Sequence, residues 1–244
     1  MIGEDGYFDD HVAASFDETA AEMFGRSTLD PAVDFLTEVA DGGPVLEFGS
    51  GTGRVALPLA ARGLDVHGIE LSRAMVAKMR AKPGGDAVDV AIGDLSTTTV
   101  DGRFRLVFVV WNTITNLVTQ EAQVACFRNA SAHLVPGGRF VVEVFVPALQ
   151  RLPVGERFQV FYGSEGYWGI DEIDVVTQRA TSHHLEIVDR KVDRLSVPYR
   201  YVWPSELDLM AELADMTLEA RYGGWHREPF TAESTDHVSI WRKR

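Results

Sequence analysis

A glycine-rich loop is the part of this sequence whose residue types and spacing are best suited to chemistry. It reads Glu47-Phe48-Gly49-Ser50-Gly51-Thr52-Gly53 and overlaps the end of the apolar run 45–48. Glycine adopts torsion angles that other residues avoid and lets backbone N–H groups approach a ligand closely. Arg54 follows the loop, where the dinucleotide-binding fingerprint requires glycine or alanine to pack its helix near a pyrophosphate. The loop therefore predicts a ligand-binding turn that is not built for a pyrophosphate.

Three acids accompany this loop at the ends of neighbouring apolar segments. Glu47 stands before the glycines, where a carboxylate suits a positively charged ligand such as a sulfonium with an amino group. Glu70 lies 17 residues beyond Gly53, a position from which a carboxylate can accept both hydroxyls of a ribose. Asp94, within Gly93-Asp94-Leu95, could accept a hydrogen bond from an adenine amino group or could only cap the backbone of a turn. Together these residues predict a nucleoside site.

Alternating strands and helices must place these residues at one edge of a sheet. Asp30-Pro31 predicts the start of a helix that ends at Gly42-Gly43, because Asp is a good N-cap and Pro fits the first helical position. A turn is expected at 135–138. Such alternation predicts a parallel sheet with helices on both faces. The expected strands are 45–48, 64–69, 87–92, 104–110 and 140–146, and the further helices are 54–62, 72–81 and 121–134.

The ends of the chain follow different patterns. Residues 1–30 are rich in aromatic side chains and predict a helical cap. After Pro147, segments 157–162, 171–179, 184–190 and 192–201 are β-rich with no helix between them, which predicts antiparallel hairpins. A helix over 204–216 and strands at 217–222 and 237–241 should complete the sheet. We thus expect a cap (1–30), a nucleoside-binding core (31–148), a β insertion (149–203) and a C-terminal part (204–244).

Composition limits the classes of partner. Lys and Arg number 23 and Asp and Glu 36, so the formal charge is −13, which disfavours a nucleic acid partner. No uncharged apolar run approaches the roughly 18 residues of a membrane span, and the first residues resemble no secretory signal, which favours a cytoplasmic protein without a membrane partner. The single cysteine, Cys126, excludes an intramolecular disulfide and is expected to be a core thiol. No metal site is expected, because His183 and His184 would point to opposite faces of a strand.

The run from Val45 to Ala60, together with Glu70, Asp94 and the turn Pro136-Gly137-Gly138, resembles the class I S-adenosylmethionine-dependent methyltransferases. The resemblance is strongest over residues 30–148 and implies a Rossmann-like sheet of seven strands with the last one antiparallel. It implies that S-adenosylmethionine is the cofactor and S-adenosylhomocysteine the product. It also implies that the loop glycines hold the methionine part, Glu70 the ribose and Asp94 the adenine. The full set of expected cofactor contacts is Glu47, Gly49, Ser50, Gly51, Thr52, Gly53, Glu70, Leu71, Met75, Gly93, Asp94, Leu95, Trp111 and Asn112.

The whole chain is also similar to a bacterial subgroup that includes small-molecule and sugar N-methyltransferases. Two positions depart from that subgroup: Phe16 stands where members often carry Tyr, and Asn116 lies near a position that can be His in sugar N-methyltransferases. Both departures disfavour an amino-sugar acceptor. The segment Trp111–Asn116 also lacks the prolines of the motif with which DNA amino-methyltransferases hold a flipped base.

The acceptor site is harder to place from sequence. An amine acceptor needs mainly alignment, whereas a hydroxyl acceptor needs a general base, for which His11 and His226 are the candidates. The residues expected to contact the acceptor are Phe8, Phe16, Asn116, Tyr162, Trp168, Tyr201 and Trp225.

The sequence therefore predicts a methyltransferase that acts on nitrogen or oxygen of a small molecule such as a secondary metabolite or a sugar. A non-catalytic module that binds the same cofactor is the alternative, and a nicotinamide-dependent oxidoreductase is a more distant one. The β insertion 149–203 could also form a homodimer contact.

Overall fold

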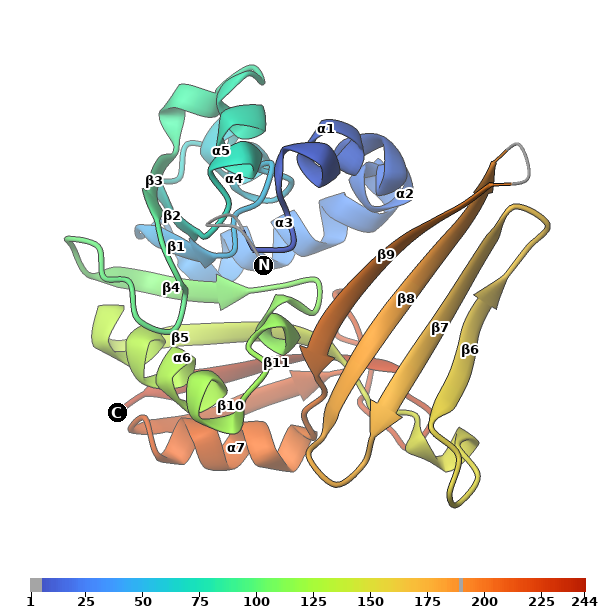
Figure 1. The fold of residues 1–244 in the computed structure, drawn as a ribbon. Coiled ribbons are helices and arrows are strands. Elements are labelled where there is room, and N and C mark those ends of the chain that lie inside the picture. The colour runs from blue at the N-terminus through green and yellow to red at the C-terminus, as the bar shows by residue number, and fades with distance from the viewer. Residues whose placement is uncertain (1–5, 189–190) are drawn as a thin grey trace.

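The computed structural model describes residues 6–188 and 191–244, and the strands in these ranges form two separate sheets (Figure 1). The larger sheet has seven strands in the order β10-β11-β5-β4-β1-β2-β3. Neighbouring strands are parallel except where β11 pairs with β5 and with β10. This topology confirms the predicted α/β fold with its antiparallel last strand. The strands are β1 (Val45–Phe48), β2 (Val66–Glu70), β3 (Asp89–Ile92), β4 (Phe104–Val109), β5 (Leu134–Phe145), β10 (Met216–Tyr222) and β11 (Asp236–Lys243).

Helices cover both faces of this sheet, because β1, β2, β4 and β5 present apolar side chains to both sides. One face packs around Leu36 and Leu59, and the other around Phe127 and Trp241. Cys126 is fully buried on the second face, which confirms the expected core thiol. The first face is covered by α3 (Arg26–Ala40), α4 (Ala56–Ala61) and α5 (Arg73–Arg80), and the second by α6 (Gln120–His133) and α7 (Pro204–Glu212).

Two short helices, α1 (Asp10–Thr19) and α2 (Ala21–Phe24), form the N-terminal segment of the described chain, and residues 1–5 lie outside the described residues. Asp9 caps α1 by accepting hydrogen bonds from two backbone N–H groups of its first turn. The segment is attached to the start of α5, where Ser72 Oγ donates to the Phe8 carbonyl at 2.5 Å. The helical segment therefore lies against the edge of the sheet where β2 ends (Figure 1).

The smaller sheet contains β6 (Phe158–Gly163), β7 (Tyr167–Asp174), β8 (Arg179–Val188) and β9 (Lys191–Arg200), each antiparallel to the next. It extends away from the larger sheet beside α1 (Figure 1). Buried Arg200 at the end of β9 fixes its base, donating to Gln123 of α6 and, at 2.6 Å, to Glu206 of α7. This polar network connects the base of the smaller sheet to two helices that cover the larger one.

One predicted strand, 171–179, is wrong in its bounds because it crosses a hairpin turn. The β-branched residues Val175 and Val176 favour a strand by composition, yet both are exposed in the turn between β7 and β8. Asp174 accepts hydrogen bonds from the Val176 N–H and the Thr177 hydroxyl, and Gln178 has a φ of 58°. Side chain–backbone bonding of this type outweighs strand propensity. The predicted strand 184–190 also shifts, to 179–188, and its residues 189–190 lie outside the described residues.

The helix expected to begin at Asp30-Pro31 begins one turn earlier, at Arg26. The Gly25 carbonyl accepts N–H groups from Thr28 and Leu29, so the helix is already established when Pro31 is reached. Burial of Leu29 extends the apolar stripe backwards by one turn, and this favours the longer helix. The reverse error occurs in α4 and α7, which are shorter than predicted.

The turn expected at 135–138 is an irregular part of β5. Phe104 of β4 pairs with Leu134 and Leu106 pairs with Arg139, so six residues of β5 lie opposite three of β4. Gly137 there has a φ of 74°, which glycine adopts without strain. The glycines thus create a bulge within a strand rather than end one.

Candidate functional site

The glycine loop connects β1 to α4, and its three alternate glycines all have positive φ, of 78°, 52° and 84° at Gly49, Gly51 and Gly53. A Cβ atom at Gly49 would lie 2.5 Å from Thr113 Cγ2, and one at Gly53 would lie 2.7 Å from Met79 Cγ. A Cβ atom at Gly51 would meet nothing within 4 Å. Two glycines are therefore required by packing inside the protein, whereas Gly51 borders open space where a ligand can approach the backbone.

Glu70, at the end of β2, holds this loop in place. Its Oε2 accepts the Gly51 N–H at 2.8 Å and its Oε1 accepts the Ser72 N–H at 2.9 Å. The two bonds fix the carboxylate between the glycine loop and the N-terminus of α5. Glu70 thus lies at the carboxyl end of β2 beside Gly51, the position expected of a residue that binds a ribose.

Glu47, in the middle of β1, is a buried carboxyl with an unsatisfied atom. Its side chain is 3% exposed, and its Oε2 has no hydrogen-bond partner among the described residues. Burial raises the pKa of Glu47 to about 8, against the opposing effect of Arg54 and with a further contribution from Glu70. Ser50 Oγ is likewise buried without a partner. A carboxyl in this state is suited to a ligand that brings a positive charge or an N–H donor.

The remaining predicted cofactor contacts take varied positions. Asp94 is exposed, and its Oδ1 accepts both the N–H and the hydroxyl of Ser96, at 2.7 and 2.5 Å. This is the backbone-capping alternative for Asp94, and its contact with an adenine stays a prediction. Met75 is buried in α5 against Ala13 of α1, while Leu71 is exposed at the end of β2. Met75 therefore supports the N-terminal segment in this structure.

Trp111 and Asn112, at the end of β4, form a turn in an unusual backbone conformation. Both have positive φ, 53° and 61°, although neither is glycine. Their conformation is fixed by hydrogen bonds to β5: Trp111 N–H donates to Glu143 Oε2 and Phe145 N–H donates to Asn112 Oδ1, both at 2.8 Å. Backbone strain of this kind is concentrated at functional sites. The turn brings both side chains to the wall of a cavity.

A charged cluster lies beneath this turn, and Glu143 is its centre. Glu143 also accepts the Trp225 indole N–H at 3.2 Å, and burial raises the pKa of its carboxyl. The Arg54 guanidinium lies 4.8 Å from the Trp111 ring centroid, and burial lowers the pKa of Arg54 although both Glu143 and Glu47 oppose that shift. Sequence analysis missed Glu143. Its signal was a single acid inside the apolar run 140–146.

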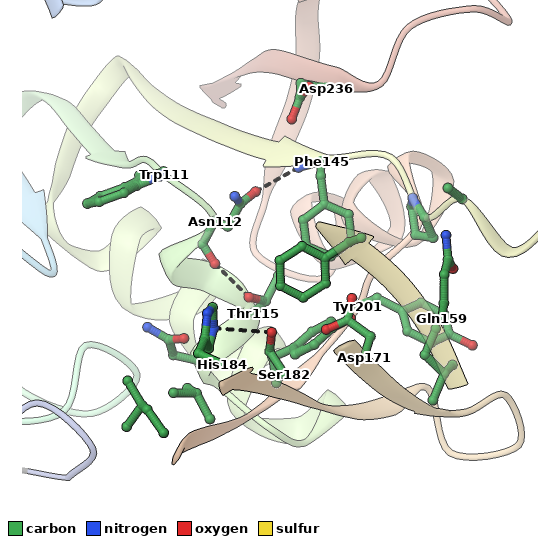
Figure 2. A pocket seen from close by; sticks show the side chains of 18 of the residues that line it. Trp111, Asn112, Thr115, Phe145, Gln159, Asp171, Ser182, His184, Tyr201 and Asp236 are labelled. Atoms are coloured by element: carbon green, nitrogen blue, oxygen red, sulfur yellow. Dashed lines mark hydrogen bonds between the residues drawn. The ribbon is translucent and has the colours of Figure 1, made fainter. Parts of the chain in front are cut away.

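A cavity of about 1310 Å³ opens between α1, the 3-10 helix η2 (Thr113–Asn116) and the smaller sheet (Figure 2). Ligand pockets are usually concave, mostly apolar sites with a few polar groups, and this cavity has that character. The structure brings together at its wall seven of the residues that were expected near a cofactor or acceptor. They are Phe8, His11, Phe16, Trp111, Asn112, Asn116 and Tyr201.

Four other residues expected at the acceptor site do not line this cavity. Tyr162 and Trp168 are exposed on the opposite face of the smaller sheet, since alternate residues of a strand point to opposite sides. Their neighbours Phe161 and Tyr167 face the cavity instead. The other two, Trp225 and His226, belong to the turn 223–228: the Trp225 ring packs 5.4 Å from Phe35, and His226 is exposed. A catalytic role for His226 therefore has no support from the cavity.

The sheet side of the cavity carries polar residues that sequence analysis did not select. His184 Nδ1 bonds to the Tyr167 hydroxyl and its Nε2 lies 3.2 Å from Ser182 Oγ. Burial lowers the pKa of His184, although Asp171 opposes that effect. Burial raises the pKa of Asp171, although hydrogen bonds from Ser182 and Tyr199 lower it. Figure 2 shows Asp171, Ser182 and His184 pointing into the cavity across from Asn112 and Thr115.

Within residues 6–188 and 191–244, no three His, Cys, Asp or Glu side chains are grouped so as to hold a metal ion. Across the same residues no helix has the length and apolar character needed to cross a membrane.

Comparisons with known proteins give a consistent result. A family described as "Methyltransferase domain" matches residues 45–138. Cypemycin N-terminal methyltransferase from a Streptomyces species is 28% identical over 243 residues, covering 94% of this chain and 98% of that protein. The structure of the CcbJ methyltransferase from Streptomyces caelestis is 34% identical, with a TM-score of 0.80 over 92% of this chain and 96% of that one.

A further solved structure shares the fold at lower identity. It is S-adenosylmethionine-bound CalS10, an amino pentose methyltransferase from Micromonospora echinaspora, 22% identical, with a TM-score of 0.67 over 93% of this chain and 96% of that one.

Proposed function

Since this chain belongs to the S-adenosylmethionine-dependent methyltransferases, we propose that it transfers the methyl group of this cofactor to the nitrogen of a small-molecule amine. The observation that carries the proposal is the large cavity that adjoins the Trp111–Asn112 turn. Support for nitrogen comes from relatives named for an N-terminal methyltransferase and an amino pentose methyltransferase. A hydroxyl acceptor would require a general base, and of the two predicted histidines only His11 lines the cavity.

The residues around the glycine loop fit the cofactor. When bound, S-adenosylmethionine supplies a methyl group activated by a sulfonium and also carries an ammonium. The unsatisfied buried oxygen of Glu47 suits these positive charges, and the open backbone at Gly51 suits close approach. Glu70 would accept from the ribose and Asp94 from the adenine. With the other predicted contacts between Gly49 and Leu95, they form our proposed cofactor site.

The cavity residues would bind, orient and dehydrate the amine. Five acids and two arginines line the cavity, so its field attracts a protonated amine. Only the neutral amine has the lone pair needed for attack, so the amine must lose a proton to solvent water before the N–CH₃ bond forms and the S–CH₃ bond breaks. Phe8, which precedes α1, and Phe16 of α1 have rings 6.1 Å apart, and together they would cover the site from solvent. Alignment and exclusion of water are sufficient for this reaction class.

The cofactor site can be tested with a pair of matched glycine variants. Gly51 and Gly63 both have positive φ, and a Cβ atom at either would meet nothing within 4 Å. Gly51→Ala and Gly63→Ala should therefore cost similar stability, about 1 kcal/mol. We expect only Gly51→Ala to weaken S-adenosylmethionine binding in calorimetry, by tenfold or more. Equal affinity of both variants for S-adenosylmethionine would refute the proposed approach of the cofactor to the backbone at Gly51.

The reaction can be tested by measuring S-adenosylhomocysteine formation with a panel of amines and phenols. Turnover with amines supports the proposal, and turnover with phenols alone refutes transfer to nitrogen. A protein that binds cofactor but yields no product with any acceptor would be the non-catalytic module. Binding of NAD in place of S-adenosylmethionine would indicate the oxidoreductase.

We also propose that the protein forms a homodimer through the outer face of the smaller sheet. Phe158, Val160, Tyr162 and Trp168 are each more than 40% exposed on its strands β6 and β7. A twofold axis would pair this apolar face with itself. Light scattering should show a dimer for wild type and a monomer for Trp168→Glu, and a monomeric wild type would refute the proposal. A cytoplasmic location stays a prediction.

A further inference from the structure

The cavity wall formed by the smaller sheet carries a continuous polar strip, which we define as Tyr167 and Asp171 of β7, Ser182 and His184 of β8, and Tyr199 of β9. Asp171 lies directly opposite Ser182 in the β7–β8 register. All five residues line the cavity, and their cavity-facing neighbours include the apolar Phe161, Ile173 and Val197. A polar strip in such a wall fixes the orientation of whatever binds there.

The hydrogen bonds of the strip run in one direction and end on Asp171. The Ser182 hydroxyl donates to Asp171, so Ser182 Oγ accepts from His184 Nε2–H at 3.2 Å. His184 Nδ1 is then the acceptor nitrogen of the neutral imidazole and accepts the hydroxyl proton of Tyr167. Tyr199 also donates to Asp171. The Asp171 carboxylate therefore accepts from two hydroxyls.

One carboxylate oxygen of Asp171 is left without a partner. Its Oδ1 is buried and accepts no hydrogen bond within the described part of the chain. An unsatisfied buried acceptor is costly, and a carboxylate more so than a neutral group. A protein retains such an atom at little cost only if a ligand supplies the missing donor.

We propose that Asp171 Oδ1 anchors the acceptor by accepting a hydrogen bond from a hydroxyl or N–H that the acceptor carries in addition to the nitrogen that is methylated. This inference rests on the proposed function and narrows it to amines with a second hydrogen-bond donor. Ser182, His184 and Tyr167 are positioning residues, because Ser182 donates to the Asp171 carboxylate and is itself held by His184 and, through it, by Tyr167.

The test compares two acceptors that differ by one donor: an amino alcohol that the wild type methylates, and the alkylamine with the same carbon skeleton. In Asp171→Asn we expect kcat/KM for the amino alcohol to fall about 10- to 100-fold, mostly through KM. For the alkylamine we expect a change of less than threefold, and the same affinity for S-adenosylmethionine. Glu172→Gln, one residue along β7 and outside the cavity lining, should resemble wild type with both acceptors.

A second pair of variants tests the hydrogen bonds from Tyr167 through His184 to Ser182. These variants keep the proposal testable even if the Asp171 variant fails to fold. In His184→Leu the ratio of kcat/KM for the amino alcohol to kcat/KM for the alkylamine should fall about tenfold. His184→Gln can replace both hydrogen bonds of the imidazole and should keep the wild-type ratio. His183→Gln, whose side chain pairs with Ser196 instead, should behave as wild type.

Two results overturn the anchor alone: equal losses with both acceptors in Asp171→Asn, or an unchanged preference for the amino alcohol. A wild-type protein that binds the cofactor but methylates no amine overturns the proposed function, and the anchor with it.

Discussion

Replacing Glu47 by Gln should remove a pH dependence of stability that the wild type carries. Burial raises the pKa of Glu47 from 4.5 to about 8, so the folded protein retains a proton that the unfolded chain has lost between these values. A group whose pKa is raised by folding stabilises the folded protein when it is protonated. The contribution of Glu47 is therefore fully present below pH 4.5 and is lost as the pH rises through about 8. The free energy of unfolding should fall by about 1.4 kcal/mol per pH unit in this window, about 5 kcal/mol in all. Gln has nearly the same shape and does not titrate.

Urea unfolding of the cofactor-free protein at intervals from pH 5 to pH 9 measures this effect. The free energy of unfolding of Glu47→Gln, relative to wild type, should rise steadily with pH and level off above pH 8. Other titrating groups are shared by the two proteins and cancel in the difference. An exposed-acid control, Glu18→Gln, should follow the wild-type curve. Parallel curves for Glu47→Gln and wild type would refute the reasoning.

Cofactor binding gives a second measurement on the same carboxyl. At pH 7 a group with a pKa of about 8 is about nine-tenths protonated, so binding a cation beside Glu47 should release close to one proton. Calorimetry in buffers of different ionisation enthalpy reports this number directly. Glu47→Gln should release none and bind more weakly. Equal proton release by both proteins would contradict the assignment of Glu47 to the cofactor.

Two further predictions concern the contacts that hold the site together. In Glu206→Gln the buried Arg200 loses its carboxylate, which should cost about 3 kcal/mol in urea unfolding. Burial alone would raise the pKa of Glu206, but hydrogen bonds led by the one from Arg200 lower it. The stabilisation by the Glu206 carboxylate is therefore present above the pKa of Glu206 in the unfolded chain, and it is lost as the pH falls through the pKa of Glu206 in the folded protein. A Glu206→Gln protein as stable as wild type at pH 7 would argue against the network. Asp17→Asn removes an ion pair from α1 to Lys82, so limited proteolysis should cut α1 faster and cofactor affinity should fall a few-fold; unchanged cleavage would show that other contacts hold α1.

The larger sheet was predictable because its signals are strong and independent of one another. The strand 45–48 was predicted with its observed bounds, since a short apolar run before glycines leaves little freedom. Ser72 was expected to begin a helix, and its hydroxyl indeed accepts the Met75 N–H. In each case local propensity and tertiary position favour the same structure.

The cavity wall formed by the smaller sheet was less predictable, because its strands β6 and β7 carry aromatic residues at adjacent positions, which point to opposite faces of the sheet. Phe161 and Tyr162 are adjacent, as are Tyr167 and Trp168, so composition cannot decide which member of each pair faces inward. That choice depends on register with the next strand, and β6 has an irregularity between Val160 and Tyr162. Sequence analysis selected the outward member both times. A one-residue change of phase exchanges the two faces of a strand.

Helix α1 contacts both the proposed cofactor site and the proposed acceptor cavity, and this has a consequence for successive reactions. Asp17 of α1 accepts a hydrogen bond from Thr52 of the glycine loop, while Phe8 and Phe16 cover the acceptor cavity. We therefore expect exchange of spent cofactor for fresh to uncover the acceptor as well, through an opening that both molecules share. An amine that receives two methyl groups should be released after the first. A time course should show the monomethylated amine accumulating in solution ahead of the dimethylated one, and its absence at early times would show that the two ligands leave by separate routes.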